Sequence, residues 1–377
     1  MDYQDFLVSL QNARQLLAQQ DEMDTGEVFE TSDTVRLCKQ PLVSVEVLAY
    51  NQGDTLEQCV ESIASQKTTF PFEIIIGNNA SEDNTAEIAA RLGAKYPDKI
   101  RILTTKRNVG LNRNARNVRR VMRGSLAAFC EGDDWWLSTT RLQEQVDIMV
   151  SNPQVTLCHG LSVFYYEKTE SYRAQYARFK SPRNVFSHIF DETYRIETAS
   201  VMCRVRDLLR IYNECPELIG AHFRMLDTQL FCLLASFGEV RLVNKLWSVR
   251  RISGKSLSQN SDLLSSARYH DSAFSMKMAL CKYFHVGSNL KNLSINYYIH
   301  PLFIWLQGAF GRQKAVEMLL ELYPEHKRNI CFIGKIPPPK NSILKKIYFH
   351  YIFKVTRYRN MFATKPVGWE EITYEKH

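Results

Sequence analysis

Hydrophobic and polar residues alternate along the first 150 residues in short blocks that predict strands followed by helices. The apolar, β-branched run at 43–50 is followed by polar residues and then by a helical pattern at 55–66, with Asp54 or Thr55 as its N-cap. The same unit recurs, with strands predicted at 72–77, 100–104 and 126–130 and helices at 83–96 and 112–122. This alternation indicates βαβ crossovers and an α/β fold with a mostly parallel sheet.

The two ends of the chain follow a different pattern. Apolar residues at helical spacing predict a helix at 3–20, so we expect an N-terminal helical extension at 1–40. Past residue 147 the predicted elements are mixed stretches at 156–166 and 195–204, a helix containing 226–237 and a strand at 240–249. We therefore expect a main domain at 41–256 and a mainly helical C-terminal region at 257–377.

Positive charge is concentrated near the C-terminus. The formal net charge is +8, yet the segment 327–365 holds ten Lys or Arg and no Asp or Glu, which leaves 38 basic and 40 acidic residues elsewhere. This distribution favours a surface that meets anionic lipid and disfavours a nucleic-acid partner. The amphipathic part at 342–358 has two interpretations: a helix in a membrane interface, or a core-docked helix whose lysines reach solvent.

Cysteine usage and hydropathy predict a cytoplasmic protein. The nine cysteines form no CxxC pair and none lies near a His at zinc-ligand spacing. The N-terminus lacks the pattern of a signal peptide, and no run of about 18 apolar residues occurs. The nearest approach, 297–310, is interrupted by polar residues and predicts a buried helix. If 342–358 binds anionic lipid, the protein would be peripheral on the inner face of the cell membrane.

Three carboxylates follow the fourth predicted strand within four positions, in Glu131-Gly132-Asp133-Asp134. Carboxylates crowded at a strand end favour a bound cation, and hard oxygen ligands suit Mg²⁺ or Mn²⁺, which often also hold substrate phosphates. Gly132 permits a tight turn. The alternative is an exposed acidic turn. Because ligands of parallel sheets bind beyond the carboxyl ends of strands, the polar residues at 50–51 and 77–83 belong to the same candidate site.

Residues 41–147 resemble the nucleotide-sugar half of family 2 glycosyltransferases, especially bacterial polysaccharide enzymes, and a weaker resemblance continues to about Ser256. The segments that carry it are Val43-Ser44-Val45, Ala49-Tyr50-Asn51, Phe72-Glu73-Ile74-Ile75-Ile76, Ser81-Glu82-Asp83-Asn84-Thr85, Asn108-Val109-Gly110, Ala115-Arg116-Asn117 and Glu131-Gly132-Asp133-Asp134. The resemblance implies a Rossmann-like GT-A fold and a metal-dependent, inverting transferase that uses Mn²⁺ or Mg²⁺. It would move a sugar from a nucleotide-sugar donor, UDP-linked, to a glycan or lipid-linked acceptor in bacterial surface polysaccharide synthesis (lipopolysaccharide or capsule).

The resemblance also assigns the donor side of the site. Ala49, Tyr50 and Asn51 would line the nucleobase pocket, and Arg116 would lie over the base or the diphosphate. For Tyr50 the alternative is packing at a strand end, and for Arg116 it is an exposed position on a helix.

In the acidic segment the resemblance distinguishes the carboxylates. Glu131 and Asp133 take the two acidic positions of the family's DxD motif, with Gly132 between them. Asp133 would be the metal ligand, Glu131 would contact ribose or metal-bound water, and Asp134 would support the site.

A general base is needed for inversion, on the side opposite the leaving diphosphate. Asp227 is the candidate, because residues 225–231 resemble the family's acidic segment before a helix; an ordinary N-cap is the alternative. Glu197 and Thr198 resemble a segment on the acceptor side. Trp135 and Trp136 could stack on sugar faces, and core packing is the alternative for one of the two.

Two positions depart from the family pattern. Asn78 stands where the family usually has an Asp that reads uracil; its amide could still bind a base, or Asn78 could be a turn residue that tolerates left-handed geometry. Ser253 stands where many relatives have a His that approaches the metal, so Arg250, Arg251 and Lys255 could carry part of the diphosphate charge. These departures leave open a catalytically inactive sugar-nucleotide-binding protein, and the basic C-terminal helix leaves open a membrane-associated scaffold. A dinucleotide-dependent oxidoreductase is disfavoured, since residues 50–55 do not form GxGxxG.

Overall fold

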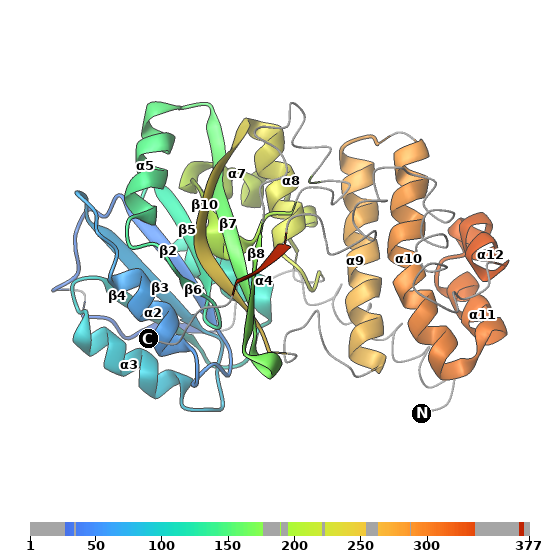
Figure 1. The fold of residues 1–377 in the computed structure, drawn as a ribbon, viewed down its shortest axis with the longest axis horizontal. Coiled ribbons are helices and arrows are strands. Elements are labelled where there is room, and N and C mark those ends of the chain that lie inside the picture. Colours follow the sequence, from blue (N-terminus) through green and yellow to red (C-terminus); the bar gives the residue numbers. More distant parts are fainter. Residues whose placement is uncertain are drawn as a thin grey trace. The chain divides into compact units, whose positions relative to one another are not determined.

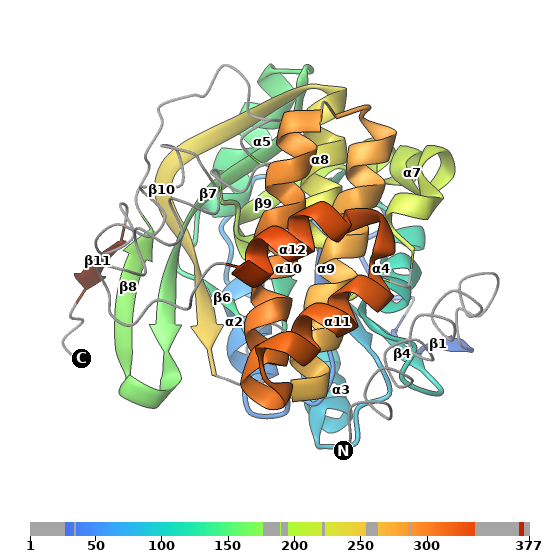
Figure 2. The same cartoon turned by 90° about the vertical axis from the view of Figure 1, so that its right-hand side faces the viewer.

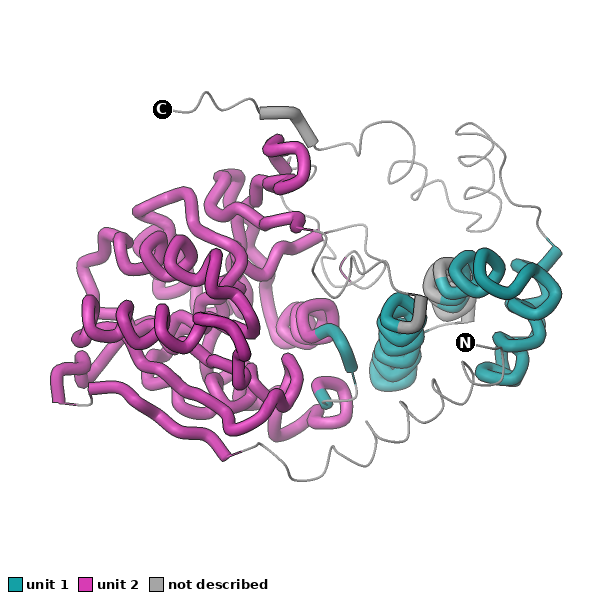
Figure 3. The backbone as a smooth tube through the Cα atoms, turned by 90° about the horizontal axis from the view of Figure 1, so that it is seen from below, with its two compact units in different colours: residues 1–22, 220–225, 254–367 teal, residues 23–219, 226–253, 368–377 magenta. Residues whose placement is uncertain are grey.

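The chain forms two compact units, coloured separately in Figure 3. One comprises residues 23–219, 226–253 and 368–377, and the other comprises residues 1–22, 220–225 and 254–367. The computed structural model describes residues 27–33, 35–175, 189, 195–220, 223–253, 263–286, 288–335 and 369–372. The predicted helix at 3–20, residues 254–256 and the basic segment at 342–358 lie outside these ranges.

The larger unit is built on a mixed sheet of eleven strands (Figure 1). The strands are β1 Val28–Glu30, β2 Val43–Ala49, β3 Phe72–Asn78, β4 Ile100–Thr105, β5 Leu126–Glu131, β6 Trp135–Trp136, β7 Val155–Tyr166, β8 Ser171–Gln175, β9 Val201–Arg204, β10 Glu239–Ile252 and β11 Trp369–Ile372. Their order is β1-β4-β3-β2-β5-β9-β7-β10-β6, and β8 pairs with β7 and β11.

The parallel pairings among β2, β3, β4 and β5 lie where the sequence predicts them, but the other pairings make the sheet mixed and not mostly parallel as expected. Strands β4, β3, β2 and β5 are parallel neighbours. Beyond them β9 pairs antiparallel with β5 and with β7, and β10 returns parallel to β7. The carboxyl ends of β2, β3 and β5 therefore meet at one edge of the sheet.

Helices cover both faces of the sheet. The α-helices of this unit are α2 Leu56–Ala64, α3 Thr85–Lys95, α4 Leu111–Arg120, α5 Arg141–Ser151, α7 Val205–Glu214 and α8 Asp227–Phe237, and the 3-10 helices are η1 Glu167–Thr169, η2 Thr198–Ser200 and η3 Pro216–Leu218. Val45 and Val47 of β2 share one apolar core with α2, α3 and α5. Side chains alternate along a strand, so Glu46 points to the other face, where it binds Arg119 of α4.

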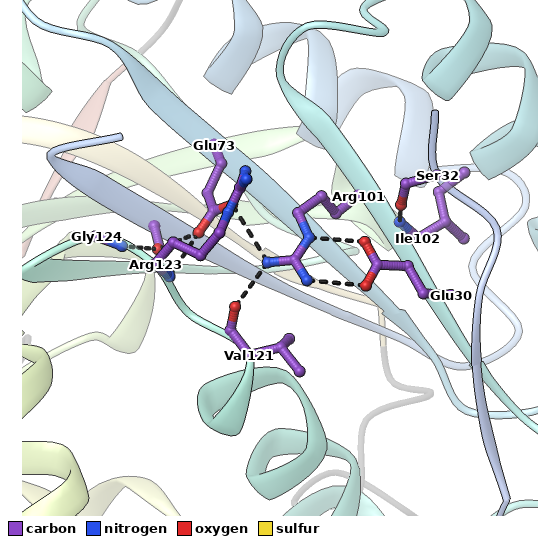
Figure 4. Close-up of polar contacts among 9 residues, drawn as sticks. Glu30, Ser32, Glu73, Arg101, Ile102, Val121, Arg123 and Gly124 are labelled. Atoms are coloured by element: carbon purple, nitrogen blue, oxygen red, sulfur yellow. Dashed lines mark hydrogen bonds and ion pairs between the residues drawn. The ribbon is translucent and has the colours of Figure 1, made fainter. Parts of the chain in front are cut away.

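A buried charged network joins the amino ends of the central strands (Figure 4). Glu73 of β3 accepts hydrogen bonds from the Ser44 hydroxyl at 2.6 Å and from Arg123 Nε at 2.7 Å. Arg101 of β4 contacts Glu73 at 3.4 Å and binds Glu30 through two bonds of 2.8 Å. Glu30 lies on β1, within the stretch 1–40 that the sequence predicts to be a helical extension, and this ion pair adds to the antiparallel pairing of β1 with β4.

In the smaller unit, the described residues 263–286 and 288–335 are mainly helical. Its helices are α9 Leu263–Tyr283, α10 Ser288–Phe310, α11 Arg312–Leu322, η4 Pro324–His326 and α12 Lys327–Lys335 (Figure 2). The buried side chains of α10 include Ile299, Leu302 and Phe303, so its second half is the buried helix predicted at 297–310. No helix within the described ranges combines the length and apolar character that a bilayer crossing requires.

Candidate active site

The loops after β2 and β3 brace each other at the carboxyl edge of the sheet. Asn51 has a φ of 53°, a left-handed geometry that Asn tolerates. Its backbone N–H donates to the Ser81 hydroxyl at 3.0 Å, and its Oδ1 accepts from the Glu82 N–H at 2.8 Å. Next to it Ala49 is buried and Tyr50 is 40% exposed. The Tyr50 ring is thus available to a ligand and is not packed into the core.

Asn78 ends β3 and is almost completely buried. Its Oδ1 accepts a hydrogen bond from the Ser81 N–H at 3.1 Å, so the amide oxygen stabilises the loop. The left-handed residue of this turn is Ala80 rather than Asn78. Asn78 therefore stabilises the turn through its side-chain oxygen and does not adopt the left-handed geometry suggested from the sequence. Binding of a base by its amide stays a prediction.

The loop between β4 and α4 is organised by Asn79, which the sequence reading did not single out. Its Nδ2 donates to Asn108 Oδ1 at 2.9 Å, and its Oδ1 accepts from the Val109 N–H at 2.9 Å. Gly110 follows with a φ of 84°, which favours glycine, and caps α4. The signal for Asn79 lay in the polar run Asn78-Asn79, but its partners are 29 and 30 residues away.

Arg116 lies on α4 and is half-buried. Its guanidinium lies 5.9 Å from the ring centroid of Tyr212 on α7, and its Nε is buried without a hydrogen-bond partner among the described residues. Arg116 is therefore not a solvated helix-surface arginine. Its known contact is with α7 and not with the acidic segment.

The turn after β5 holds three carboxylates in a poorly solvated environment. Burial, together with the charge of Asp133, raises the pKa of Glu131 to about 7. Burial also raises the pKa of Asp133 and, with the charges of Asp133 and Glu131, that of Asp134 well above its ordinary range. The turn is therefore not the exposed acidic turn considered as the alternative.

Gly132 lies in a closely packed part of this turn, where a side chain would displace Gln52. A Cβ at this position would lie 2.1 Å from Oε1 of Gln52 and 3.2 Å from the carbonyl oxygen of Leu48. The Gly132 carbonyl also accepts a 2.9 Å bond from the hydroxyl of Thr55, the N-cap residue of α2. The β2–α2 loop thus fixes the position of the acidic turn.

The carboxylates fit a divalent cation in their chemistry. Oε2 of Glu131 is buried without a hydrogen-bond partner in the described part of the chain, and the Asp133 charge acts directly on Glu131. No group of three or more His, Cys, Asp or Glu within the described ranges could hold a metal by itself. A cation bound to these two residues would therefore take further ligands from a substrate, as Mg²⁺ commonly does with phosphates.

The end of β10 runs along the acidic turn. The N–H of Arg251 donates to Asp134 Oδ1 at 2.9 Å, and its Nε donates to the Asp133 carbonyl at 3.0 Å. Arg250 binds Glu197 at 2.7 Å. Asp134 thus anchors β10 to the turn. Ser253 follows directly after β10.

Asp227 is the first residue of α8 and is exposed. Its Oδ1 accepts from the neighbouring Thr228 N–H at 2.7 Å, while the N-cap position belongs to Leu226. The N-cap alternative therefore does not describe it. The charge of Asp227 acts on Glu131 and on Arg250, so this residue, 96 positions after Glu131, lies within electrostatic reach of the acidic turn.

The four candidates for the acceptor side differ in their burial and contacts. Trp136 is buried in the core with its ring 4.0 Å from the Arg141 guanidinium, whereas Trp135 is half-buried with Arg251 5.0 Å above its ring. Trp136 is thus the core tryptophan of the pair. Thr198 begins η2, and Glu197, directly before it, is only 4% exposed with both carboxylate oxygens bound to arginines.

Comparison with known proteins agrees with this arrangement. Residues 44–208 match the model of the family described as Glycosyl transferase family 2. An uncharacterized protein of Mycobacterium tuberculosis is 35% identical over 124 residues, 33% of this chain and 36% of the relative. An Escherichia coli protein named UDP-Glc:alpha-D-GlcNAc-diphosphoundecaprenol beta-1,3-glucosyltransferase WfaP is 33% identical over 129 residues, 34% of this chain and 47% of the relative. These matches span about a third to a half of the relatives' lengths.

A solved structure is similar in fold. The crystal structure of S. aureus TarS 1–349 in complex with UDP-GlcNAc has a TM-score of 0.50 at 12% sequence identity, and the likeness covers 84% of this chain and 89% of that one. At this identity the likeness concerns the arrangement of the backbone alone.

Proposed function

We propose that the protein transfers a sugar from a nucleotide-sugar donor to a glycan or lipid-linked acceptor with inversion, because residues 44–208 match the model of glycosyl transferase family 2 and the backbone resembles that of a glycosyltransferase structure. UDP is the proposed nucleotide and Mn²⁺ or Mg²⁺ the proposed cofactor. The name of the E. coli relative, which describes a UDP-Glc-dependent transferase acting on a diphosphoundecaprenol-linked sugar, supports a lipid-linked acceptor. Membrane binding through 342–358 stays a prediction.

The main support for this proposal is that acidic side chains from distant parts of the chain lie close enough for their charges to interact. Glu131 and Asp133 come from the turn after β5, and Asp227 comes from the start of α8, yet their charges act on one another or on the same arginine. Acidic groups gathered at the carboxyl edge of a parallel sheet, among them Glu131 and Asp133 with raised pKa values, are typical of a functional site.

The roles divide between the two sides of this edge. Asp133 and Glu131 would hold the cation, which when bound stabilises the negative charge of the departing nucleoside diphosphate. Tyr50, Asn51 and Asn78 end the neighbouring strands, where a base and ribose would lie. Asp227 would accept the proton of the acceptor hydroxyl, because its carboxylate is exposed and engaged only by its neighbour Thr228 among the described residues.

A donor screen tests the proposal. UDP-, GDP- and dTDP-sugars with Mn²⁺ are added to the full chain, and the change in melting temperature and the release of nucleoside diphosphate are measured. We expect one nucleotide class to stabilise the protein in a Mn²⁺-dependent way and to be hydrolysed slowly. Failure of every donor to stabilise the protein would refute the function, whereas stabilisation without hydrolysis or transfer would indicate an inactive binding protein.

Substitution of the proposed base separates binding from chemistry. Asp227→Asn should retain the donor-induced thermal shift and lose transfer by about 100-fold or more, the usual contribution of a positioned base. Asp147→Asn is the matched control, since Asp147 is an exposed Asp of helix α5. Full transfer activity in Asp227→Asn would remove Asp227 from this role.

A further inference from the structure

Arg250 occupies an unusual position at the end of β10. Its side chain is 29% exposed, and its Nη1 donates to Oε2 of Glu197 at 2.7 Å. Val249, the residue before it, pairs with Trp135 of β6, and the N–H of Arg251, the residue after it, binds Asp134. The backbone of Arg250 is thus fixed between two contacts to the segment that carries the candidate metal ligands.

The charges of the site converge on this guanidinium. Although burial alone would lower the pKa of Arg250, the charges of Glu197, Asp134 and Asp227 raise it overall. In return the positive charge of Arg250 lowers the pKa values of Glu131 and Asp133 against the effect of their burial. Arg250 therefore interacts with both the proposed metal side and the proposed base side.

Glu197 holds Arg250 from a rigid segment. Its other carboxylate oxygen is bound by Arg195. The residues that follow Glu197 are fixed from α5, because Arg141 donates to the carbonyls of Ala199 and Val201, and Gln145 donates to that of Ser200. With both oxygens paired, Glu197 is better suited to orient Arg250 than to contact an acceptor.

The guanidinium keeps donors for a ligand. Arginine carries five N–H donors in a planar fork that matches phosphate oxygens. In the described ranges only Glu197 accepts a hydrogen bond from Arg250. The Arg250 guanidinium is bound by Glu197 at one nitrogen and is partly exposed. It also lies beside the acidic turn, so it is suited to bind a diphosphate.

We propose that Arg250, positioned by Glu197, contacts the diphosphate of the nucleotide-sugar and stabilises the charge of the leaving nucleoside diphosphate. This inference rests on the proposed function and assigns Glu197 a positioning role instead of the acceptor contact expected from the sequence. In this role Arg250 provides positive charge on the side of the site where Ser253 replaces the family's His.

The test compares binding of a nucleoside diphosphate with binding of its monophosphate. UDP and UMP, or the GDP or dTDP pair if the donor screen selects that base, are titrated calorimetrically into the full chain with Mn²⁺. Arg250→Gln should weaken diphosphate binding about 10- to 100-fold, as expected for a charge-assisted contact, and should change monophosphate binding much less. Arg250→Lys should restore part of the loss, because it keeps the charge without the fork.

Two further variants control for a structural effect. Arg241→Gln removes another half-buried arginine of β10, which pairs with Glu239 at the opposite end of the strand, and should leave the diphosphate-to-monophosphate ratio unchanged. Glu197→Gln keeps Arg250 but loosens it, so the ratio should fall by less than in Arg250→Gln.

The outcomes separate this inference from the proposed function. If the wild-type protein binds the nucleotides but Arg250→Gln keeps the wild-type ratio, Arg250 is a structural counter-ion and the inference is wrong while the function stands. A wild-type ratio in Glu197→Gln would remove the positioning role of Glu197. If the wild-type protein binds neither nucleotide, the function and the inference fall together.

Discussion

Two buried glutamates on neighbouring strands should differ strongly in what their neutralisation costs. Glu46 of β2 is 3% exposed and binds Arg119 through two bonds of 2.7 and 2.8 Å. Arg119 is also 3% exposed, and it forms a further hydrogen bond to the Tyr212 hydroxyl at 3.1 Å. Glu46→Gln would leave a buried guanidinium without a counter-charge, which costs about 4–5 kcal/mol.

Glu73→Gln removes a carboxylate that is equally buried, but its partners keep other contacts. Arg101 retains its two bonds to Glu30 and a 2.6 Å bond to the Val121 carbonyl. The side chain of Arg123 is 33% exposed and can be hydrated. We therefore expect a loss of about 2 kcal/mol, below the usual range for a broken buried pair. The loss in the free energy of unfolding thus depends on which contacts the partner arginine keeps, and not on how deeply the glutamate is buried.

Urea unfolding followed by tryptophan fluorescence measures both costs, because Trp136 and Trp247 are buried in the core of this unit. Glu57→Gln is the control: its ion pair with Arg91 is more than half exposed on both sides and should contribute less than about 1 kcal/mol. A Glu73→Gln variant that is destabilised as much as Glu46→Gln, or more, would refute the reasoning from alternative partners.

The remaining predictions concern acid stability and the acidic turn. Burial lowers the pKa of His159 to about 4, so its contribution to stability is present above its ordinary pKa of about 6.5 and is lost as the pH falls towards 4, by up to about 3 kcal/mol. His159→Gln should therefore flatten the fall in the free energy of unfolding between pH 7 and 4.5; an unchanged slope would contradict this. Gly132→Ala should cost about 1–3 kcal/mol by overpacking against Gln52. In thermal denaturation, Gln52→Ser in the same chain should recover part of that loss. A complete lack of recovery would show that the Leu48 carbonyl, and not Gln52, causes the clash.

The central part of the fold was predictable because its signal is local. Strands β2 to β5 are short apolar runs bounded by polar residues. Helices α2 and α3 between them each bury an apolar face, whereas α4 buries mainly Asn and Arg side chains. The position of Glu131 and Asp133 at a strand end followed directly from this pattern. Helices α5 and α7 and the short strand β6 were not predicted, although both helices bury apolar residues at helical spacing. The period was missed because each helix is short and most of its exposed positions are polar.

Pairings between distant residues could not be predicted in the same way. Glu46 and Arg119 are 73 positions apart, and Glu197 and Arg250 are 53 positions apart. In the sequence Glu46 reads as a polar position on a half-exposed strand, whereas α4 and α7 bury it completely. The sequence suggested Arg250 as a phosphate contact, but it did not indicate that Glu197 would bind Arg250 in addition to the nearby Arg195.

The two edges of the sheet differ in how their charges are satisfied, and this difference supports the location of the site. At the amino edge Glu73 is fully paired with Ser44, Arg101 and Arg123. At the carboxyl edge Glu131 has a buried oxygen without a partner in the described part of the chain and a pKa of about 7. A raised carboxylate pKa means that the folded state disfavours the charge, which costs stability as the pH rises from 4.5 through 7. Elsewhere in this sheet a buried carboxylate is paired with arginines, as at Glu73. The loss of stability caused by the unpaired Glu131 oxygen is therefore best explained by binding of a positively charged group at the carboxyl edge.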